Sequence, residues 1–181
     1  MVDILPYLYK RLRDADPSVR SEEQLTLLDV GGRTGVGSDL LASIFYGIWS
    51  KRKISVDVLD IDDTYEDYIY ASARFVRQFI CAYIFNMESD QYDYIVCSHV
   101  IEHIDEPFAF CEQLRRVSKR GVVMYCPYEE QDPIVGHNTI THEMIEGFGA
   151  QDITVLDNTW FWKQESRPEL KTVLFWLPAL T

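Results

Sequence analysis

A short, mostly apolar segment followed by clustered glycines is the feature that most constrains the fold of this chain. The apolar segment is Leu25–Val30, and Gly31, Gly32 and Gly35 follow it directly. The next segment, Ser38–Ser50, has apolar residues at helical spacing. This order is typical of a buried strand, a tight turn and the start of a helix, because glycine permits positive φ and close approach of a ligand to the backbone. Free N–H groups at the helix start make the turn a candidate site for a nucleotide-like ligand.

The rest of the chain alternates further apolar segments with amphipathic ones. We expect strands at Ile54–Leu59, Gln78–Phe85, Tyr92–Ser98, Gly121–Tyr125, Asp152–Phe161 and Thr172–Leu177. We expect further helices at Thr64–Val76, Pro107–Ser118 and Thr141–Phe148. This alternation predicts an α/β fold, with parallel βαβ units in one doubly wound sheet and helices on both faces. The last two strands have no helix between them, so we expect them to form an antiparallel hairpin at one edge.

The length of 181 residues favours a single domain. We expect residues 1–23 to form a short helix and a polar connector, and residues 24–181 to form the α/β core. No apolar run reaches the roughly 18 residues that cross a membrane. The chain also does not start with the basic residues and long apolar run of a secretory leader. The sequence therefore predicts a cytoplasmic protein without a membrane partner.

Charge and cysteine content narrow the partners further. The chain has 29 acidic and 17 basic residues and a formal net charge of −12. Because the phosphates of nucleic acids attract Lys and Arg, an acidic chain without a basic stripe disfavours nucleic acid as a partner. The cysteines form no CxxC pair, and we expect them to be reduced residues of the core. They are Cys81, Cys97, Cys111 and Cys126.

Acidic residues follow the second predicted strand, where ligands of open parallel sheets are bound. Asp60 directly follows this strand. A carboxylate at this position can accept hydrogen bonds from both hydroxyls of a ribose. Asp62 is the neighbouring candidate, and its alternative role is to cap the following helix together with Asp63. We therefore expect Asp60 to contact the sugar of a nucleotide-like ligand.

Two histidines, His99 and His103, follow the fourth predicted strand. Histidine titrates near neutral pH, so either residue could accept the proton of a hydroxyl group. The alternative is that Glu102 and His103 only brace the loop and cap the next helix. Glu102, His103 and His137 could also bind a divalent metal. Isolated loop histidines are usually surface residues, so we expect no metal.

Aromatic residues cluster in the last two predicted strands. The cluster comprises Trp160, Phe161, Trp162, Phe175 and Trp176. Alternation along the strands would bury some of these side chains and expose others. We expect core packing to be their main role, and an exposed part could serve an acceptor pocket or a dimer contact.

In this order, the segments resemble the class I S-adenosylmethionine-dependent methyltransferases. Residues 29–35, Asp-Val-Gly-Gly-Arg-Thr-Gly, are similar to the family's Asp/Glu-x-Gly-x-Gly-x-Gly loop. Residues 59–62 resemble the strand end that binds the ribose. Residues 92–107 and 114–127 resemble the blocks around the fourth and fifth strands, which are more specific together than the loop alone. The resemblance implies a Rossmann-like sheet of about seven strands, with S-adenosyl-L-methionine as cofactor.

The resemblance also implies which residues line the cofactor site. They are Asp29, Gly31, Gly32, Arg33, Gly35, Asp60, Ile61, Asn86 and Ser98. Arg33 departs from the family, because it takes the place of the middle glycine. Its side chain could crowd the methionine end of the cofactor, point outward or meet a carboxylate. An acid after the third strand, common on the adenine side, is not evident, so Asn86 or backbone groups could serve instead.

The block around Glu102 and His103 also resembles that of metal-assisted O-methyltransferases acting on RNA 3′ ends or ubiquinone precursors. Those enzymes have a further Glu where this chain has His99, which argues against the metal.

We expect a methyltransferase that O-methylates a small-molecule acceptor such as a sugar or secondary metabolite. His99 or His103 would take the proton of the acceptor during in-line transfer. No long insertion resembles a substrate lid, so the acceptor site would be open or completed by a second subunit in a homodimer. The alternative is an inactive binding or scaffold subunit with the same fold, which Arg33 and the missing acid would favour. A nicotinamide-dependent oxidoreductase fits the fourth-strand block and the closing hairpin less well.

Overall fold

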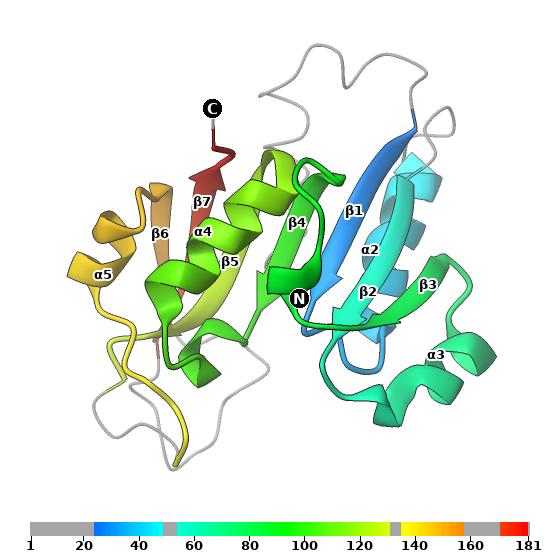
Figure 1. Ribbon diagram of the computed structural model, residues 1–181, viewed down its shortest axis with the longest axis horizontal. Coiled ribbons are helices and arrows are strands. Elements are labelled where there is room, and N and C mark those ends of the chain that lie inside the picture. The colour runs from blue at the N-terminus through cyan, green and yellow to red at the C-terminus, as the bar shows by residue number, and fades with distance from the viewer. Residues whose placement is uncertain (1–23, 49–53, 131–134, 158–170, 181) are drawn as a thin grey trace.

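The computed structural model describes residues 24–48, 54–130, 135–157 and 171–180. Within these residues, seven strands form one sheet in the order β3-β2-β1-β4-β5-β7-β6 (Figure 1). The strands are β1 (Leu25–Val30), β2 (Ile54–Asp60), β3 (Val76–Cys81), β4 (Tyr92–Ser98), β5 (Ser118–Tyr128), β6 (Gln151–Asp157) and β7 (Lys171–Pro178). Strands β1 to β5 pair in parallel, and β7 is antiparallel to both β5 and β6. The predicted doubly wound sheet with a closing antiparallel hairpin is confirmed.

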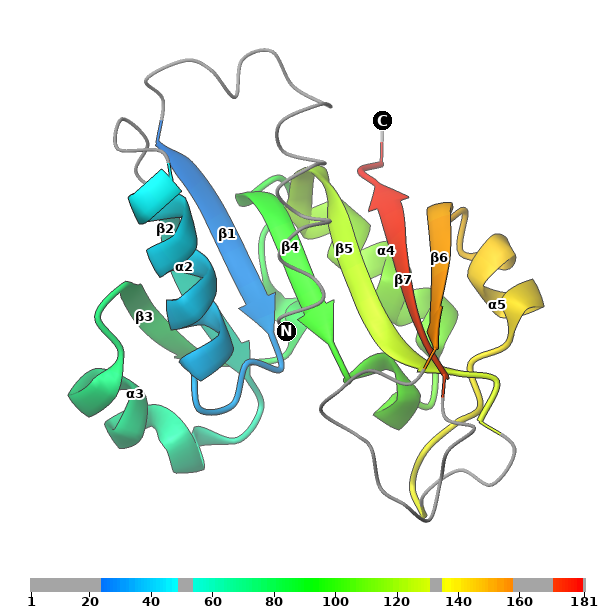
Figure 2. The same cartoon turned by 180° about the vertical axis from the view of Figure 1, so that it is seen from behind.

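Helices cover both faces of this sheet. The α-helices are α2 (Val36–Ile48), α3 (Glu66–Ser72), α4 (Pro107–Val117) and α5 (His142–Gly147). Short 3₁₀ helices follow β2, β3 and β4, namely η2 (Asp63–Tyr65), η3 (Ile84–Asn86) and η4 (Ile101–His103). Helices α4 and α2 lie on opposite faces, as the front and back views show (Figures 1 and 2). No helix among the described residues is long and apolar enough to cross a membrane.

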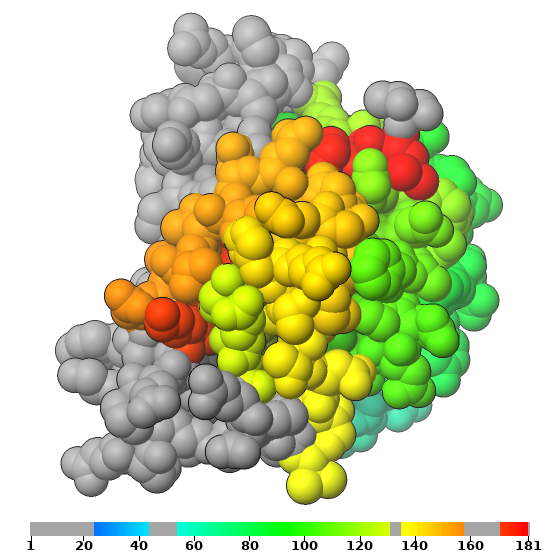
Figure 3. Space-filling model, turned by 90° about the vertical axis from the view of Figure 1, so that its left-hand side faces the viewer, coloured from blue at the N-terminus to red at the C-terminus, as the bar shows by residue number. Residues whose placement is uncertain are grey.

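The central strands have apolar residues on both faces because both faces are covered. In β4, Ile95 and Cys97 join the core beneath α4, whereas Tyr94 and Val96 join the core on the opposite face, with Leu41 of α2. Side chains alternate between the faces of a strand, so the apolar run from Tyr94 to Cys97 supplies both cores. At the far edge, β6 has no fully buried residue, and Figure 3 shows β6 and α5 at the surface.

Two predicted element boundaries on the β3 side of the sheet are wrong. The helix predicted at Thr64–Val76 is instead η2 followed by α3, which ends at Ser72. Asp39 of α2 accepts hydrogen bonds from the backbone N–H groups of Arg74 and Phe75, at 2.7 and 2.6 Å. These two hydrogen bonds hold the chain after α3 in the direction of β3. The strand predicted at Gln78–Phe85 occupies Val76–Cys81 instead, because the later apolar residues form η3 and bury Ile84 in the core.

The cysteines and aromatic residues follow the predictions only in part. Cys97, Cys111 and Cys126 are buried free thiols, but Cys81 is exposed at the end of the edge strand β3, so its predicted core position is wrong. Phe175 and Trp176 of β7 are buried, as predicted. Trp160, Phe161 and Trp162 lie outside the described residues. Residues 1–23 lie outside them too, so the N-terminal helix and connector stay a prediction.

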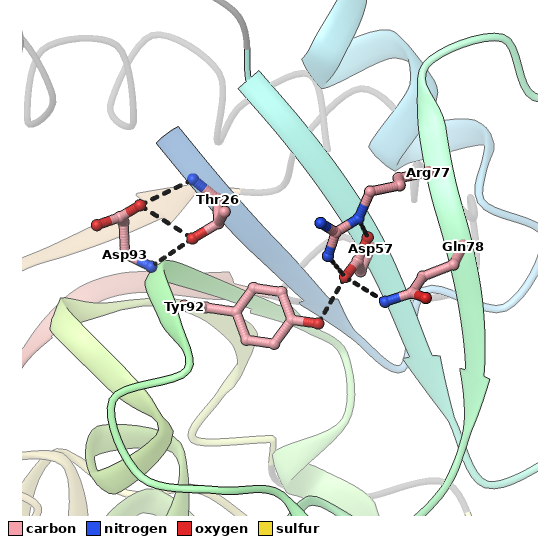
Figure 4. A network of polar contacts seen from close by, with 6 residues as sticks. All are labelled: Thr26, Asp57, Arg77, Gln78, Tyr92 and Asp93. Carbon is pink, nitrogen blue, oxygen red and sulfur yellow. Dashed lines mark hydrogen bonds and ion pairs between the residues drawn. The ribbon is translucent and has the colours of Figure 1, made fainter. Parts of the chain in front are cut away.

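A buried polar cluster links three strands on the face opposite α2 (Figure 4). The Asp57 side chain of β2 is fully buried and accepts hydrogen bonds from Arg77, Gln78 and Tyr92. Arg77 and Gln78 belong to β3, whereas Tyr92 begins β4 and reaches Asp57 past β1. A buried carboxylate needs several donors to offset its lost hydration, and the cluster supplies them. It therefore stabilises the sheet without facing the carboxyl ends of the strands.

A second polar contact fastens the amino ends of the two central strands. Asp93 of β4 accepts hydrogen bonds from the backbone N–H and hydroxyl of Thr26 in β1, both at 2.9 Å (Figure 4). In return, the Asp93 N–H donates to the Thr26 hydroxyl at 3.0 Å. These contacts lie at the end of the sheet opposite to the glycine loop.

Candidate functional site

The glycine loop between β1 and α2 turns sharply next to the end of β4. Gly31 and Gly35 have φ values of 72° and 67°, in the left-handed region that favours glycine. A Cβ atom on Gly31 would lie 2.2 Å from a methyl group of Val100, which follows β4. A Cβ atom on Gly32 would lie 2.8 Å from Val58. A side chain at either glycine would therefore collide with its neighbours, so the backbone stays uncovered at these two positions, between the ends of β1, β2 and β4.

Asp29 lies beneath this loop, at the end of β1. It is 2% exposed, and its carboxylate accepts a hydrogen bond from the hydroxyl of Ser38 in α2. Burial raises the pKa of Asp29 to about 6, although the Ser38 hydrogen bond acts in the opposite direction. Asp29 is one of the residues predicted to line the cofactor site. In the structure it is buried under the glycine loop and supports this loop.

Asp60 ends β2 and joins the glycine loop to the segment that follows β2. Its Oδ2 accepts a hydrogen bond from the backbone N–H of Arg33, and its Oδ1 accepts one from the backbone N–H of Asp62, both at 3.1 Å. Asp62 caps η2 by accepting a hydrogen bond from the Thr64 N–H at 2.9 Å. The Thr64 hydroxyl and N–H together hold the pKa of Asp62 below its usual value. Asp62 thus has the capping role that the sequence left as its alternative.

The Arg33 side chain points towards the segment after β2. Its Nη2 donates a hydrogen bond to the Tyr65 hydroxyl at 3.1 Å, and its guanidinium carbon lies 5.4 Å from the centroid of the Tyr65 ring. Tyr65 belongs to η2, and β2 lies on the side of β1 away from β4. Arg33 therefore takes the outward direction among the alternatives that the sequence allowed, on the side away from β4.

His99 follows β4 and is held by contacts with β5 and η4. Its φ is 55°, a strained value for a residue other than glycine. Its N–H donates to the Tyr125 carbonyl at 2.8 Å, and its ring meets the Tyr125 ring edge-on, with centroids 5.0 Å apart. Its Nδ1 lies 3.2 Å from Oε1 of Glu102, which is 1% exposed. A buried carboxylate thus orients the imidazole at the carboxyl end of β4.

His103 and His137 meet beside this histidine–carboxylate pair. Their ring centroids are 4.4 Å apart and their planes are nearly perpendicular. The His137 Nδ1 lies 3.6 Å from a carboxylate oxygen of Glu130, two residues after the end of β5. Glu102 contacts His99 rather than this histidine pair. Among the described residues, no three His, Cys, Asp or Glu side chains are grouped in a way that could bind a metal ion.

The remaining predicted residues lie at the same end of the sheet. Ile61 directly follows β2 and is 65% exposed, Asn86 ends η3, and Ser98 is the last residue of β4. The carboxyl ends of β1, β2, β3 and β4 share one edge because these strands are parallel. Tyr65 was not among the predicted site residues. The available signal in the sequence was the arginine at a position where the family has glycine.

This arrangement combines a glycine-rich loop, a carboxylate beside it and an oriented imidazole. Val100 packs on Gly31, so the loop and the histidine segment are direct neighbours. The site can bind a ligand with hydroxyl groups near Asp60 and transfer a proton at His99.

Comparisons with known proteins concern the family and the fold of the chain. A family model described as "Methyltransferase domain" matches residues 4–169. No curated protein matches the chain in sequence.

Several solved structures share the fold. One is the magnesium protoporphyrin IX methyltransferase ChlM from Synechocystis PCC 6803, solved with bound SAM, which superposes with a TM-score of 0.68 at 13% sequence identity. The match covers 98% of this chain and 79% of the ChlM chain. The CurJ carbon methyltransferase has a TM-score of 0.69 at 13% identity, covering 99% of this chain, which spans only 54% of the CurJ chain. The [4+2]-cyclase SpnF has a TM-score of 0.67 at 12% identity, covering 86% of this chain and 75% of SpnF. Identities this low establish a common fold only.

Proposed function

The chain belongs to the methyltransferase family whose model matches residues 4–169, and from this premise we propose that it O-methylates a small-molecule acceptor. S-adenosylmethionine is the methyl donor, which family membership and fold neighbours solved with bound SAM or SAH support. The neighbours also include carbon methyltransferases. The single observation that supports a hydroxyl acceptor is an imidazole oriented by a buried carboxylate beside the glycine loop, because a hydroxyl is a weak nucleophile until a base takes its proton, whereas an amine can attack with its own lone pair.

The residues of the glycine loop fit this cofactor. The loop has no side chain on Gly31, Gly32 and Gly35, so its backbone can approach the amino-acid end of a ligand closely. Each oxygen of Asp60 accepts one hydrogen bond and has a further acceptor position, since a carboxylate oxygen accepts about two. Asp60 would use these positions for the ribose hydroxyls, and Ile61, Asn86 and Ser98 would line the same site. The bound cofactor supplies an electrophilic methyl group.

His99 is the proposed general base. Nδ1 lies 3.2 Å from Glu102, so Nε2 would be the ring atom that takes the proton of the acceptor hydroxyl, and the acceptor would have to reach it at a buried position. The strained backbone of His99 and its contacts with Tyr125 limit the positions that the ring can take. His103 is the second candidate base, oriented by His137. The proposed mechanism needs no metal ligand.

Two further properties of the protein are also proposals. Three buried free thiols, Cys97, Cys111 and Cys126, support a reducing compartment such as the cytoplasm. A homodimer that completes the acceptor site stays a prediction, which sedimentation of the full chain tests.

Calorimetry and turnover measurements on three proteins test the proposed function. We expect wild-type protein to bind S-adenosylmethionine and Asp60→Ala to bind it at least about tenfold more weakly, because the ribose hydroxyls lose their acceptor. We expect His99→Ala to keep the cofactor affinity and to lose about a hundredfold or more in turnover, the usual contribution of a general base. Absence of binding at millimolar cofactor would favour the scaffold alternative, and unchanged turnover in His99→Ala would move the base to His103.

A further inference from the structure

Arg33 is the part of the glycine loop that the proposed function leaves unexplained. It has a φ of 45°, where a residue other than glycine is strained. Such strain persists only where the surrounding structure holds the residue. A glycine would adopt this backbone without strain. The arginine side chain therefore has contacts that offset the strain.

Among the described residues, Arg33 contacts the last residue of β2 and the segment that follows this strand. Its backbone N–H donates to Asp60 Oδ2 at 3.1 Å, and its Nη2 donates to the Tyr65 hydroxyl at 3.1 Å. Its guanidinium also lies over the Tyr65 ring, with 5.4 Å between the guanidinium carbon and the ring centroid. A guanidinium at this distance from an aromatic face is attracted by the ring. Arg33 thus fastens the glycine loop to η2.

Asp60 lies between the two segments that Arg33 and Tyr65 connect. One carboxylate oxygen of Asp60 accepts from the glycine loop, and the other accepts from the N–H of Asp62. Asp62 in turn caps η2, which ends at Tyr65. The orientation of Asp60 therefore depends on both the glycine loop and η2 being held in their present places.

We propose that Arg33 and Tyr65 form a strap that positions Asp60 for the adenosine half of the cofactor. This inference rests on the proposed function, because it assigns the ribose to Asp60. Tyr65 acts through Arg33 and Asp60, so it is a positioning residue rather than a catalytic one. The guanidinium lies on the β2 side of the loop, so the strap acts on the adenosine half and not on the amino-acid end. Removal of the strap should therefore weaken the binding of any ligand that contains adenosine.

Calorimetry with two ligands tests the strap. S-adenosylhomocysteine contains adenosine and the amino-acid end, whereas 5′-methylthioadenosine contains adenosine without that end. The variants are Arg33→Gly, which suits the positive φ, Tyr65→Phe, which removes only the hydroxyl, and the double variant. Tyr68→Phe is the matched control, because Tyr68 lies on α3 with its side chain exposed. Thermal unfolding of each variant checks that the fold is retained.

We expect Arg33→Gly and Tyr65→Phe each to weaken binding of both ligands by about fivefold, the usual effect of losing one hydrogen bond. The double variant should bind about as weakly as Arg33→Gly alone, because both changes remove the same contact. Tyr68→Phe should bind as wild type does.

Three results would overturn the strap. Affinities within twofold of wild type in both single variants would show that Asp60 does not depend on it. A loss for S-adenosylhomocysteine but not for 5′-methylthioadenosine would place Arg33 at the amino-acid end. Fully multiplicative losses in the double variant would show that the two residues act separately. Wild-type protein that binds neither ligand would instead refute the proposed function, and the strap with it.

Discussion

Removal of one hydroxyl from the buried cluster around Asp57 should measurably destabilise the protein. Tyr92 is 2% exposed, and its hydroxyl donates to Asp57 at 2.6 Å. Burial strongly raises the pKa of Tyr92, so the hydroxyl stays protonated and keeps its donor role at ordinary pH. Tyr92→Phe retains the ring and opens no large cavity, so the lost hydrogen bond to a charged group dominates its effect.

The size of the effect follows from the contacts that remain. Asp57 keeps its bonds to Gln78 and to both Arg77 nitrogens, so it is not left without donors. The loss should be about 1.5–3 kcal/mol, the value of one hydrogen bond to a charged group. Asp57→Ala should cost at least as much, because the buried Tyr92 hydroxyl and the Gln78 amide lose their acceptor, whereas the half-exposed Arg77 can turn to water.

Urea unfolding followed by circular dichroism measures both changes. Tyr92→Phe should lower the midpoint by about 1 M at an unchanged m-value. Tyr70→Phe is the matched control, because that side chain is 58% exposed, and it should leave the midpoint as in wild type. A loss below about 0.5 kcal/mol for Tyr92→Phe would refute the assignment of this cluster as a stabilising element.

Three further changes test the site and its supports. Burial raises the pKa of Asp29 to about 6, so the folded state binds a proton more tightly than the unfolded state, and stability falls as pH rises from about 4 to 6. Asp29→Asn lacks this fall, so the stability difference between variant and wild type should move in the variant's favour by about 2 kcal/mol between pH 4 and 7 in urea titrations; a constant difference would contradict the shift. Gly31→Ala should destabilise the protein by at least about 2 kcal/mol in the same assay, because the added methyl group meets Val100 at a positive φ; wild-type stability would contradict this packing. Glu102→Gln should lower turnover more than cofactor affinity, and a chelator should leave turnover unchanged; complete loss restored by Mg²⁺ or Mn²⁺ would contradict the mechanism without metal.

The parts of the fold that the sequence predicted well are those with an uninterrupted pattern. The segment Tyr92–Ser98, which is apolar from Tyr94 to Cys97, predicted β4 with its observed bounds, because a strand covered on both faces is mostly apolar. The boundaries of α3 and β3 were wrong for a different reason. Asp39, on another helix, accepts the N–H groups of Arg74 and Phe75, and residues distant in sequence leave no trace in local periodicity.

The features of the candidate site likewise fall into those that the sequence predicted and those that it did not. Glycines followed by a helix, and an acid at the next strand end, predicted the place of the loop and of Asp60 from residue types alone. The residue types did not predict that Asp62 caps η2, that Glu102 is buried against His99, or that Tyr65 binds Arg33.

The sequence by itself determined the order of strands and helices along the chain, because backbone preferences and hydrophobic periodicity act over a few neighbouring residues. It also determined the edge of the sheet where polar residues gather, because these residues directly follow the predicted strands. Only the tertiary structure decided the direction of Arg33, because its partner Tyr65 is 32 residues away in the chain. It likewise decided the burial of Glu102, which follows from packing against strands and loops that no local pattern describes. A side chain on an exposed loop has several directions of similar energy, and contacts between distant segments select one of them.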